Sequence, residues 1–323
     1  MPTQKLSWFH TSILLCLSAC LILPALNVRA NNLELHNVYA QIKPVLEKNA
    51  YGIPVYINSR DENDTMTGVI YGVIHHPFDV LSQTLRTPAN WCDIAPQHLN
   101  IKACTYQPIK DYCQLTFYSG RKFYEKADDV YQLAYQFDIN EQDKDFIHIS
   151  LSSEEGPVGT SHYRLNVKAI PLGKSSSFIY FSYSYQYNFI TSMGMGIYLA
   201  TLGSGKVGFS ITGKDKKGNS IYVDGVRGII ERNSVRYYLA IQSYLDTLHI
   251  KPKDRFTARI DKWFDLTEQH HLQLHEMDKK EYLEHKQLER KDQQRLQQSA
   301  SQNSISENSC TSEEPLIKPL KRH

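Results

Sequence analysis

The chain has 323 residues, with 36 lysines and arginines against 34 aspartates and glutamates, and 41% of its side chains are hydrophobic. This length allows one sizeable core with extensions. Because the net charge is only +2 and no basic cluster is interleaved with aromatic residues, the sequence argues against a nucleic-acid partner.

The N-terminus has the pattern of a secretory signal. Lys5 precedes an apolar run over residues 13–26, and Val28-Arg29-Ala30 has the small-residue form of a signal-peptidase site. We therefore predict that residues 1–30 are removed and that the protein is exported, to the periplasm if its source is a diderm bacterium. The alternative is a lipoprotein anchored at Cys20, which ends a lipobox-like sequence. No later stretch is long and apolar enough to span a bilayer.

The first elements of the mature chain are a helix and a strand. Residues 31–50 have apolar side chains at helical spacing, although Pro44 kinks or limits the helix. A short extended piece over residues 55–58 leads through a polar turn to a strand over residues 66–74. Gly68 and Gly72 in that strand would let a helix or a ligand approach the backbone closely.

Two short helices and a meander of strands follow. Pro77 and Pro88 each suit the first turn of a helix, and Pro96 ends the second helix. Polar or Gly/Pro turns then separate successive β-rich runs, which predicts one antiparallel sheet. The expected strands are residues 99–106, 113–122, 130–139, 146–152, 162–170 and 177–187.

The last third of the sequence is mainly helical. We expect a helix over residues 189–202, a hairpin formed by residues 208–213 and 220–223, and a strong helix over 230–248 that Pro252 cannot continue. A long charged helix over residues 251–298 follows, of which only the first half is amphipathic enough to dock. Residues 299–323 have the composition of a disordered tail.

Four cysteines lie beyond residue 30. In an exported protein, Cys92, Cys104 and Cys113 indicate a disulfide, because they lack the paired C-x-x-C spacing of a structural zinc site. We favour Cys92 with Cys104, which would tie a helix to a strand, whereas Cys104 with Cys113 would close a hairpin. Cys310 lies in the polar tail and is expected to be unpaired.

The order of elements resembles the START-like superfamily, also called the SRPBCC or birch-pollen-allergen-like fold. The resemblance covers residues 51–250 and is carried by residues 72–80, by Pro88-Ala89-Asn90-Trp91 and by residues 231–240. It implies an α+β helix-grip fold, in which a curved antiparallel sheet wraps on a long late helix and the early helices close one end. The expected helix over 189–202 and the hairpin after it depart from the simplest form and would alter the mouth of the pocket.

This resemblance implies a cavity that binds or carries a lipid or another hydrophobic ligand, with no cofactor, no metal and no catalysis. The residues assigned to ligand binding are Tyr71, Phe181, Tyr183, Tyr185, Met193 and Tyr238. Alternatively, the aromatic residues are ordinary core and cross-strand partners. Arg227, Arg232 and Arg236 would either hold an anionic head group or occupy ordinary surface positions.

Catalytic groups are hard to find in the sequence. Adjacent His75 and His76 would point to opposite faces of a strand, so with Asp79 they fit a strand end and helix cap better than a site. Gly203-Ser204-Gly205 lacks the Gly-x-Ser-x-Gly frame of a nucleophile elbow. Two alternatives to a ligand carrier therefore stay open. One is a cyclase- or dehydratase-like enzyme that uses pocket tyrosines or a histidine, and the other is an envelope adaptor whose C-terminal helix contacts a protein or a membrane surface.

Overall fold

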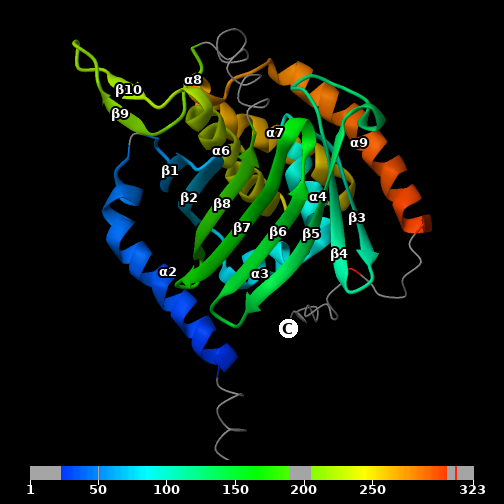
Figure 1. The fold of residues 1–323 in the computed structure, drawn as a ribbon, viewed down its shortest axis with the longest axis horizontal. Coiled ribbons are helices and arrows are strands. Elements are labelled where there is room, and N and C mark those ends of the chain that lie inside the picture. The colour runs from blue at the N-terminus through cyan, green and yellow to red at the C-terminus, as the bar shows by residue number, and fades with distance from the viewer. Residues whose placement is uncertain (1–22, 50, 189–204, 304–309, 311–323) are drawn as a thin grey trace, which may run out of the picture.

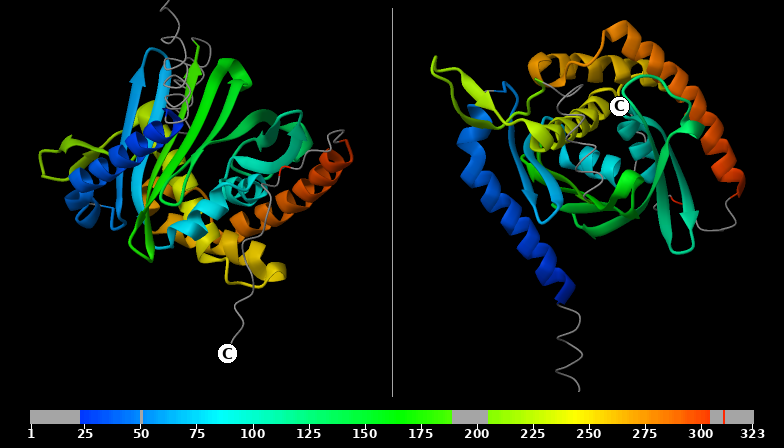
Figure 2. Two further views of the ribbon diagram at one scale, coloured as in Figure 1. Left: turned by 90° about the horizontal axis from the view of Figure 1, so that it is seen from below. Right: turned by 45° about the horizontal axis from the view of Figure 1, so that its top comes forward.

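The fold is built on one curved antiparallel sheet with helices packed against it (Figure 1). The computed structural model describes residues 23–49, 51–188, 205–303 and 310. The main sheet has eight strands in the order β1-β2-β8-β7-β6-β5-β4-β3, and a separate sheet pairs β10 with β9. The predicted α+β helix-grip fold is confirmed, because the strands curve around helix α6, as the right-hand view of Figure 2 shows.

The elements have the following bounds along the chain. The strands are β1 Val55–Glu62, β2 Thr65–Ile74, β3 Ile101–Ile109, β4 Tyr112–Ser119, β5 Tyr131–Gln142, β6 Ile147–Glu155, β7 Thr160–Leu172, β8 Ser176–Tyr187, β9 Ile211–Lys214 and β10 Ser220–Tyr222. The helices are α2 Leu23–Glu47, α3 Phe78–Leu85, α4 Pro88–Ile94, α6 Gly225–Asp246, α7 Pro252–Glu268, α8 His271–Leu274 and α9 Lys279–Asn303, with the short 3-10 turns η1 Ala95–Gln97, η2 Ala127–Asp129 and η3 Pro157–Gly159. The expected helix over 189–202 lies outside the described residues.

The topology explains why the sheet can enclose a space. Strands β3 to β8 follow one another as neighbours, and β2 then pairs with β8, the last strand of that series. Helices α3 and α4 carry the chain from β2 to β3, which forms the opposite edge. The early helices therefore span the distance between the two ends of the sheet and close one end of its interior, as the sequence predicts.

The turn between β1 and β2 is shorter than the sequence suggests. We expected a polar turn from Arg60 to Thr65, but the ladder continues to the pair Glu62 and Thr65. Only Asn63 and Asp64 form the loop, and both have positive φ, 51° and 56°. Two residues of this type in the left-handed region match the twist of a tight hairpin. The exposed polar residues before them therefore belong to a strand.

Helix α6 packs directly onto β2 at two glycines. A Cβ at Gly68 would lie 2.5 Å from Oγ of Ser234, and one at Gly72 would lie 2.7 Å from Cε2 of Tyr238. The hydroxyl of Tyr238 donates to the carbonyl of Val73 at 3.1 Å. The sequence allowed either a helix or a ligand to pack closely against these glycines, and in the structure helix α6 does so.

The Gly72→Ala variant should lower the free energy of unfolding by about 1–3 kcal/mol, because the new methyl group would overpack against the Tyr238 ring. Urea denaturation measures the change. The matched control is Gly213→Ala in β9, where no atom lies within 4 Å of the added Cβ. We expect this control to be neutral or slightly stabilising, and equal effects of both variants would contradict the close packing at β2.

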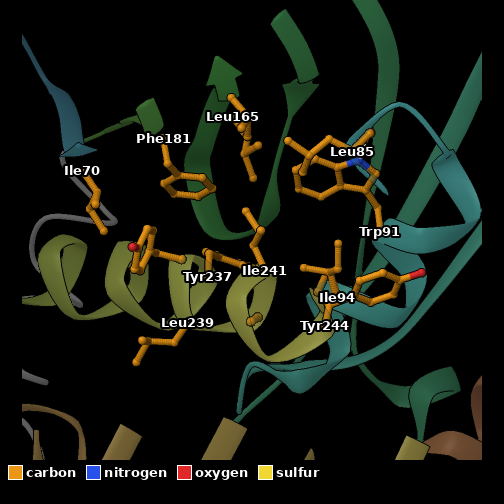
Figure 3. Close-up of a cluster of buried hydrophobic side chains, with 14 of the residues drawn as sticks. Ile70, Leu85, Trp91, Ile94, Leu165, Phe181, Tyr237, Leu239, Ile241 and Tyr244 are labelled. Carbon is orange, nitrogen blue, oxygen red and sulfur yellow. Dashed lines mark hydrogen bonds between the residues drawn. The ribbon is translucent and has the colours of Figure 1, made fainter. Parts of the chain in front are cut away.

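The main hydrophobic core lies between α6 and the inner face of the sheet. Figure 3 shows Ile241 of α6 on the side that faces Phe181 of β8 and Leu165 of β7, and all three are buried. Trp91 of α4 closes one end, where its Nε1 donates to the carbonyl of Leu85 at 2.7 Å. Burial of such residues stabilises the fold by roughly 1.5–3 kcal/mol each.

Helix α2 covers part of the outer face of the same sheet. Its Leu35 and Leu46 are buried in a second cluster with Phe178 of β8 and Ile170 of β7. The ring of Tyr39 lies 5.0 Å from that of Phe178. The helix predicted over residues 31–50 is present and begins earlier, at Leu23. Both faces of the sheet at β2, β7 and β8 are therefore apolar and covered.

The C-terminal region differs most from expectation. In place of one helix over 251–298, the chain forms α7, a short α8 and a reversed α9 that continues to Asn303. Tyr282 of α9 is fully buried and its ring lies 5.2 Å from Trp263 of α7. The two helices thus pack against each other, which a single straight helix cannot do. The expectation that the polar half does not dock is also wrong, since Lys286, Glu289 and Gln293 are buried.

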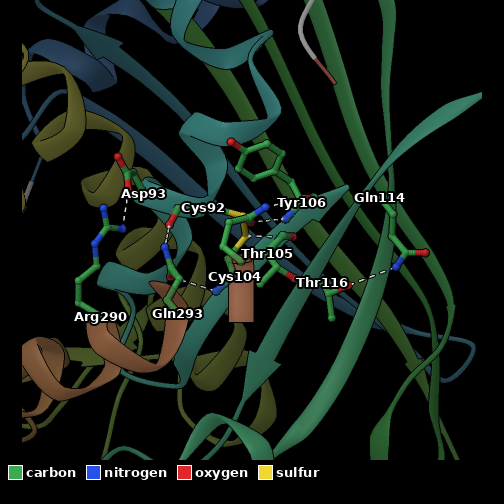
Figure 4. Close-up of a disulfide and its surroundings, with 10 residues drawn as sticks. Cys92, Asp93, Cys104, Thr105, Tyr106, Gln114, Thr116, Arg290 and Gln293 are labelled. Carbon is green, nitrogen blue, oxygen red and sulfur yellow. Dashed lines mark hydrogen bonds and ion pairs between the residues drawn. A yellow bond between two sulfur atoms is a disulfide. The ribbon is translucent and has the colours of Figure 1, made fainter. Parts of the chain in front are cut away.

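Helix α9 covers the exposed edge of β3 with side-chain amides. Gln293 accepts from the amide of Cys104 at 3.1 Å and donates to the carbonyl of Cys92 at 2.8 Å (Figure 4). One turn later, Gln297 accepts from the amide of Tyr106 and donates to its carbonyl, both at 2.9 Å. The three bonds to Cys104 and Tyr106 replace those of a missing neighbouring strand and keep the edge from pairing with another chain, while the bond to Cys92 ties α9 to α4.

Two disulfides connect these elements. Cys92 of α4 is bonded to Cys104 of β3, the pairing that the sequence favours, with 4.8 Å between the Cα atoms. Cys113 of β4 is bonded to Cys310, so the expectation of an unpaired Cys310 is wrong. The two cysteines are 197 residues apart in the sequence, so the spacing of the cysteines does not indicate this bond. It forms because Cys310, beyond the end of α9, lies next to β4. Disulfides of this kind fit an oxidising compartment.

Within the ranges that the structure describes, no helix combines the length and apolar character needed to cross a membrane.

Candidate functional site: a cavity beneath helix α6

A cavity of about 820 Å³ lies between α6 and the inner face of the sheet. Its walls come from β4, β5, β7, β8 and α6, with parts of the β4–β5 and β6–β7 connections. Phe123 and Val158 on those two connections are 47% and 58% exposed although both line the cavity. The cavity therefore opens to solvent between them. Its size is within the usual range of small-molecule sites.

A continuous belt of aromatic rings forms the apolar part of the lining. The belt consists of Phe117, Tyr135, Tyr163, Tyr183 and Tyr237, one each from β4, β5, β7, β8 and α6. Successive ring centroids are separated by 4.9, 6.4, 6.2 and 5.9 Å. These spacings are typical of mutually packed aromatic rings. The belt therefore links the sheet to the helix across the cavity.

The tyrosine hydroxyls of this belt are neutral at physiological pH. Burial raises the pKa of Tyr135 and Tyr183 well above 10, and it also raises the pKa of Tyr237. Tyr163 donates to Oγ1 of Thr160 at 2.8 Å. Among the contacts of the described residues, the hydroxyls of the other three tyrosines have no hydrogen-bond partner. They can therefore donate to or accept from a ligand, but they are poor general bases.

Charged side chains gather at one end of the cavity around Glu276. Its carboxylate is 2.6 Å from Nζ of Lys122 and 3.0 Å from a terminal nitrogen of Arg236, and it also contacts Lys206. Arg232 lines the same cavity, and its guanidinium donates to the carbonyl of Val207 at 3.2 Å. Both arginines are 2% exposed. In the described ranges, one carboxylate thus lies among four basic side chains.

The pKa shifts of this cluster reflect its uneven charge. Burial alone would raise the pKa of Glu276, but the charges of Arg236 and Lys122 and hydrogen bonds from Lys122 and Lys206 lower it to about 2. Burial lowers the pKa of Lys122, Glu276 opposes this effect, and the charges of Arg236 and Arg232 add to it. Like charges therefore repel one another within the cluster.

His98 contributes a neutral imidazole to the cavity wall. Its ring stacks on Tyr237 with 4.8 Å between centroids, and its Nδ1 accepts from the amide of Asn100 at 3.1 Å. Burial first, and then the charges of Arg236 and Lys286, lower the pKa of His98 well below 6.5. The proton of the neutral ring is thus on Nε2, which makes no hydrogen bond of normal geometry with a described residue.

The residues assigned to ligand binding from the sequence occupy three different places. Tyr183 lines the cavity, and Tyr185 lies behind it, stacked on Tyr163 at 5.4 Å. Phe181 and Tyr238 are buried in the core between sheet and helix.

Tyr71 lies on the opposite face of the sheet and does not line the cavity. It belongs to the cluster under α2, where its ring stacks 6.0 Å from that of Phe178. The alternation of residues along β2 assigns them to two faces of the sheet. It does not identify the inner face, because apolar groups cover both faces here. Met193 lies outside the described residues.

The histidines and arginines considered from the sequence do not all lie at the cavity. His76 pairs with Asp246 at 2.7 Å, and Nδ1 of His75 lies 3.3 Å from Oγ of Ser176, so both histidines contact neighbouring elements away from the cavity. Arg227 donates to Oγ of Ser59 at 3.1 Å and does not line the cavity. Of the three arginines considered for a head group, only Arg232 and Arg236 line the cavity.

Sequence reasoning missed several lining residues. Tyr135 and Tyr163 had a usable signal, because each occupies an inward position of an alternating strand. Lys122 and Glu276 had none, since each lies in a connection after a regular element. Their approach depends on how α8 and α9 reverse the chain beside α6.

One group of side chains outside the cavity has the donor set of a metal ligand cluster. Glu268, His271 and His275, at the end of α7 and in and after α8, have donor atoms within 4.8 Å of one another. Nδ1 of His271 and of His275 lie 2.9 and 3.0 Å from the Glu268 carboxylate. These hydrogen bonds by themselves account for the cluster.

The chain matches no protein-family model and no curated protein. Solved structures of START/SRPBCC type are similar to part of it. The human StAR-related lipid transfer protein 5 is 9% identical, covering 68% of this chain and 99% of its own, with a TM-score of 0.33.

Two further similar structures are enzymes. Norcoclaurine synthase from Thalictrum flavum is 16% identical over 43% of this chain and 82% of its own, with a TM-score of 0.30. The Zhui aromatase/cyclase from Streptomyces sp. R1128 is 11% identical over 41% and 73%, also with a TM-score of 0.30. Because identities and TM-scores are this low, the helix-grip assignment depends on the strand order and on the position of α6.

Proposed function

We propose that this protein binds or carries a lipid or another hydrophobic ligand in the cavity beneath α6, without catalysing a reaction. The observation that supports this function is the aromatic belt around a cavity of about 820 Å³ that opens to solvent. A ligand that fills such a space gains roughly 25 cal/mol for each Å² of apolar surface removed from water. Three neutral tyrosine hydroxyls would orient it.

The enzyme alternative would use the histidine or the carboxylate that lines the cavity, His98 or Glu276. The pKa of His98 is well below 6.5 and that of Glu276 is about 2, so both are weak bases at neutral pH. A general acid or base is most effective when its pKa is close to the working pH. The chemistry of these two groups therefore favours binding over proton transfer.

Export belongs to the same proposal. The two disulfides, Cys92 with Cys104 and Cys113 with Cys310, support an oxidising compartment such as the periplasm. Cleavage after Ala30 would leave the part of α2 from residue 31 onward, which includes the buried Leu35 and Leu46. Intact-mass analysis of protein from its source distinguishes this cleavage from lipidation at Cys20.

An adaptor role would have to use the outer surface of the C-terminal helices. The inner side of α9 packs on β3 and α7 through residues that include Tyr282 and Gln293. A partner protein or a membrane surface would therefore meet only the exposed side of α9. A chain truncated within α9 should lose the cover of β3 as well as any partner contact.

Native mass spectrometry of the protein purified from its own organism tests the carrier function. We expect an apolar molecule bound in a one-to-one ratio, which organic extraction releases. Protein that is always empty and that also fails to bind a neutral fluorescent probe of apolar sites would contradict the proposal.

Filling the cavity should abolish ligand binding without unfolding the protein. Ser119 lines the cavity at the end of β4, so Ser119→Trp places a large ring in it. We expect probe affinity to fall at least about tenfold, because the ring occupies the volume that the ligand needs. The matched control is Gln132→Trp, an exposed position on β5 next to the cavity residue Leu133. Retained affinity in Ser119→Trp, with circular dichroism showing a folded protein, would place the ligand elsewhere.

A further inference from the structure

In the described part of the chain, the charged end of the cavity brings four basic side chains together around one carboxylate. Lys122, Lys206, Arg232 and Arg236 line it together with Glu276. The neighbouring Glu231 is committed elsewhere, because its carboxylate accepts from Oγ of Ser59 at 2.7 Å and from the amides of Phe209 and Ser210. The residues 189–204 that precede Lys206 contain no charged side chain. Among the residues that the structure describes, four basic side chains and one carboxylate therefore line this end of the cavity.

Burial raises the electrostatic free energy of four basic side chains that lie close together. Both arginines are 2% exposed, and the side chains of Lys122 and Lys206 are 29% and 28% exposed. Charges removed from water need an opposite charge with hydrogen-bond acceptors. Glu276 contacts three of the four cations, so in the described residues one negative charge lies beside several positive ones. A second anionic group at this end would relieve the repulsion between the cations.

The charged end and the aromatic belt are parts of one cavity. Tyr237 belongs to the belt, and Arg236 and Asn233 on the same helix lie at the charged end, where an Arg236 nitrogen is 3.3 Å from Oδ1 of Asn233. An apolar body among the rings would thus place its terminal group beside the cations. Arginine and lysine bind carboxylates and phosphates through charge-assisted hydrogen bonds.

We propose that the ligand is an amphipathic anion, with an apolar body in the aromatic belt and a carboxylate or phosphate head group at the cluster of Lys122, Lys206, Arg232 and Arg236. This inference rests on the proposed carrier function and specifies its ligand class. The four basic side chains hold the head group, and Glu276 keeps Lys122, Lys206 and Arg236 in position.

A displacement assay separates the head-group inference from the carrier function. The neutral probe N-phenyl-1-naphthylamine reports occupancy, and the competitors are hexadecanoate, hexadecyl phosphate and hexadecanol, which share one chain. We expect the two anions to displace the probe at concentrations about tenfold or more below that of the alcohol. The better of the two anions distinguishes a carboxylate ligand from a phosphate ligand.

Charge-removing variants test the assigned residues. In Lys122→Gln/Lys206→Gln, the buried pair of Arg236 and Glu276 stays intact, and the preference for anions over hexadecanol should fall at least about fivefold. The control is Lys216→Gln/Lys217→Gln, which removes the same charge from the exposed turn between β9 and β10. Its preference should equal that of the native protein, and a direct titration gives the probe affinity of each variant, against which displacement is measured.

Each outcome has one meaning. Equal displacement by acid and alcohol overturns the head-group inference and leaves the carrier function standing. The head-group inference is also overturned if the control variant loses the anion preference as strongly as the cavity variant does. The preference would then depend on the overall charge of the protein. Failure of the native protein to bind the probe or any competitor overturns both proposals.

Discussion

Replacement of Glu289 by alanine is expected to lower the free energy of unfolding by about 3–5 kcal/mol. Glu289 lies between two buried lysines, 2.9 Å from Nζ of Lys102 and 2.6 Å from Nζ of Lys286. All three side chains are at most 3% exposed. Without the carboxylate, two like charges would face each other in the interior. Urea denaturation at pH 7 measures the loss.

The pH dependence gives a second readout of the same site. Burial lowers the pKa of Lys286 from 10.5 to about 8, Glu289 opposes the shift, and Lys102 adds to it. Between these two values the unfolded chain binds more protons than the folded one, so the contribution of Lys286 to stability rises with pH. Removal of Glu289 lowers the folded pKa further. The deficit of Glu289→Ala should therefore be smaller at pH 9 than at pH 7.

Two variants show whether the effect comes from buried charge. Glu284→Ala removes an exposed partner 4.0 Å from Lys280 on the same helix and should change stability by at most about 1 kcal/mol. The combination of Lys102→Met, Lys286→Met and Glu289→Leu should recover most of the loss, because a buried ion network is replaced by apolar groups. A loss in Glu289→Ala no greater than in Glu284→Ala would mean that α9 does not dock as described.

Removal of the Cys92–Cys104 bond is the second large expected effect. In Cys92→Ala/Cys104→Ala the free energy of unfolding should fall by about 3 kcal/mol, because the unfolded chain gains the freedom of a loop with a sequence separation of 12. The bond also fixes α4 to β3. Gln293 holds both elements as well, through the carbonyl of Cys92 in α4 and the amide of Cys104 in β3. Chemical denaturation under oxidising conditions measures the change.

The two disulfides should differ in their access to reductant. Cys92 and Cys104 are 3% and 0% exposed, whereas Cys113 and Cys310 are partly exposed. Mild reduction of the folded protein followed by alkylation should therefore modify Cys113 and Cys310 first, as peptide mass analysis would show. Simultaneous modification of all four cysteines would contradict the burial of the Cys92–Cys104 bond.

Local patterns predict most of the sheet and the early helices. Alternation and turn residues identify β2 and the six strands from β3 to β8 within a few residues, because a half-buried strand needs that period. Pro77 and Pro88 mark the starts of α3 and α4. The polar end of β1 was missed, since pairing with β2 stabilises it and no apolar pattern is required.

The C-terminal region shows where composition misleads. Residues of α9 such as Lys286, Glu289 and Gln293 look solvent-exposed in the sequence, because each is strongly polar. In the folded protein they satisfy Lys102 and the backbone groups of an edge strand. Only the position of β3 beside α9 shows that these polar groups are buried with partners.

The sequence by itself determined the α+β class, the succession of strands and helices along the chain, the late helix and the favoured pairing of Cys92 with Cys104. Those features depend on periodicity and on neighbours close in the chain. The tertiary structure alone decided that Tyr71 faces α2, that Tyr183 lines a cavity and that Glu276 joins basic residues from three other segments. Alternating side chains of a strand point to opposite faces of the sheet, but this alternation does not identify which face lines a cavity. Charges that are distant in the sequence interact only after the chain has folded.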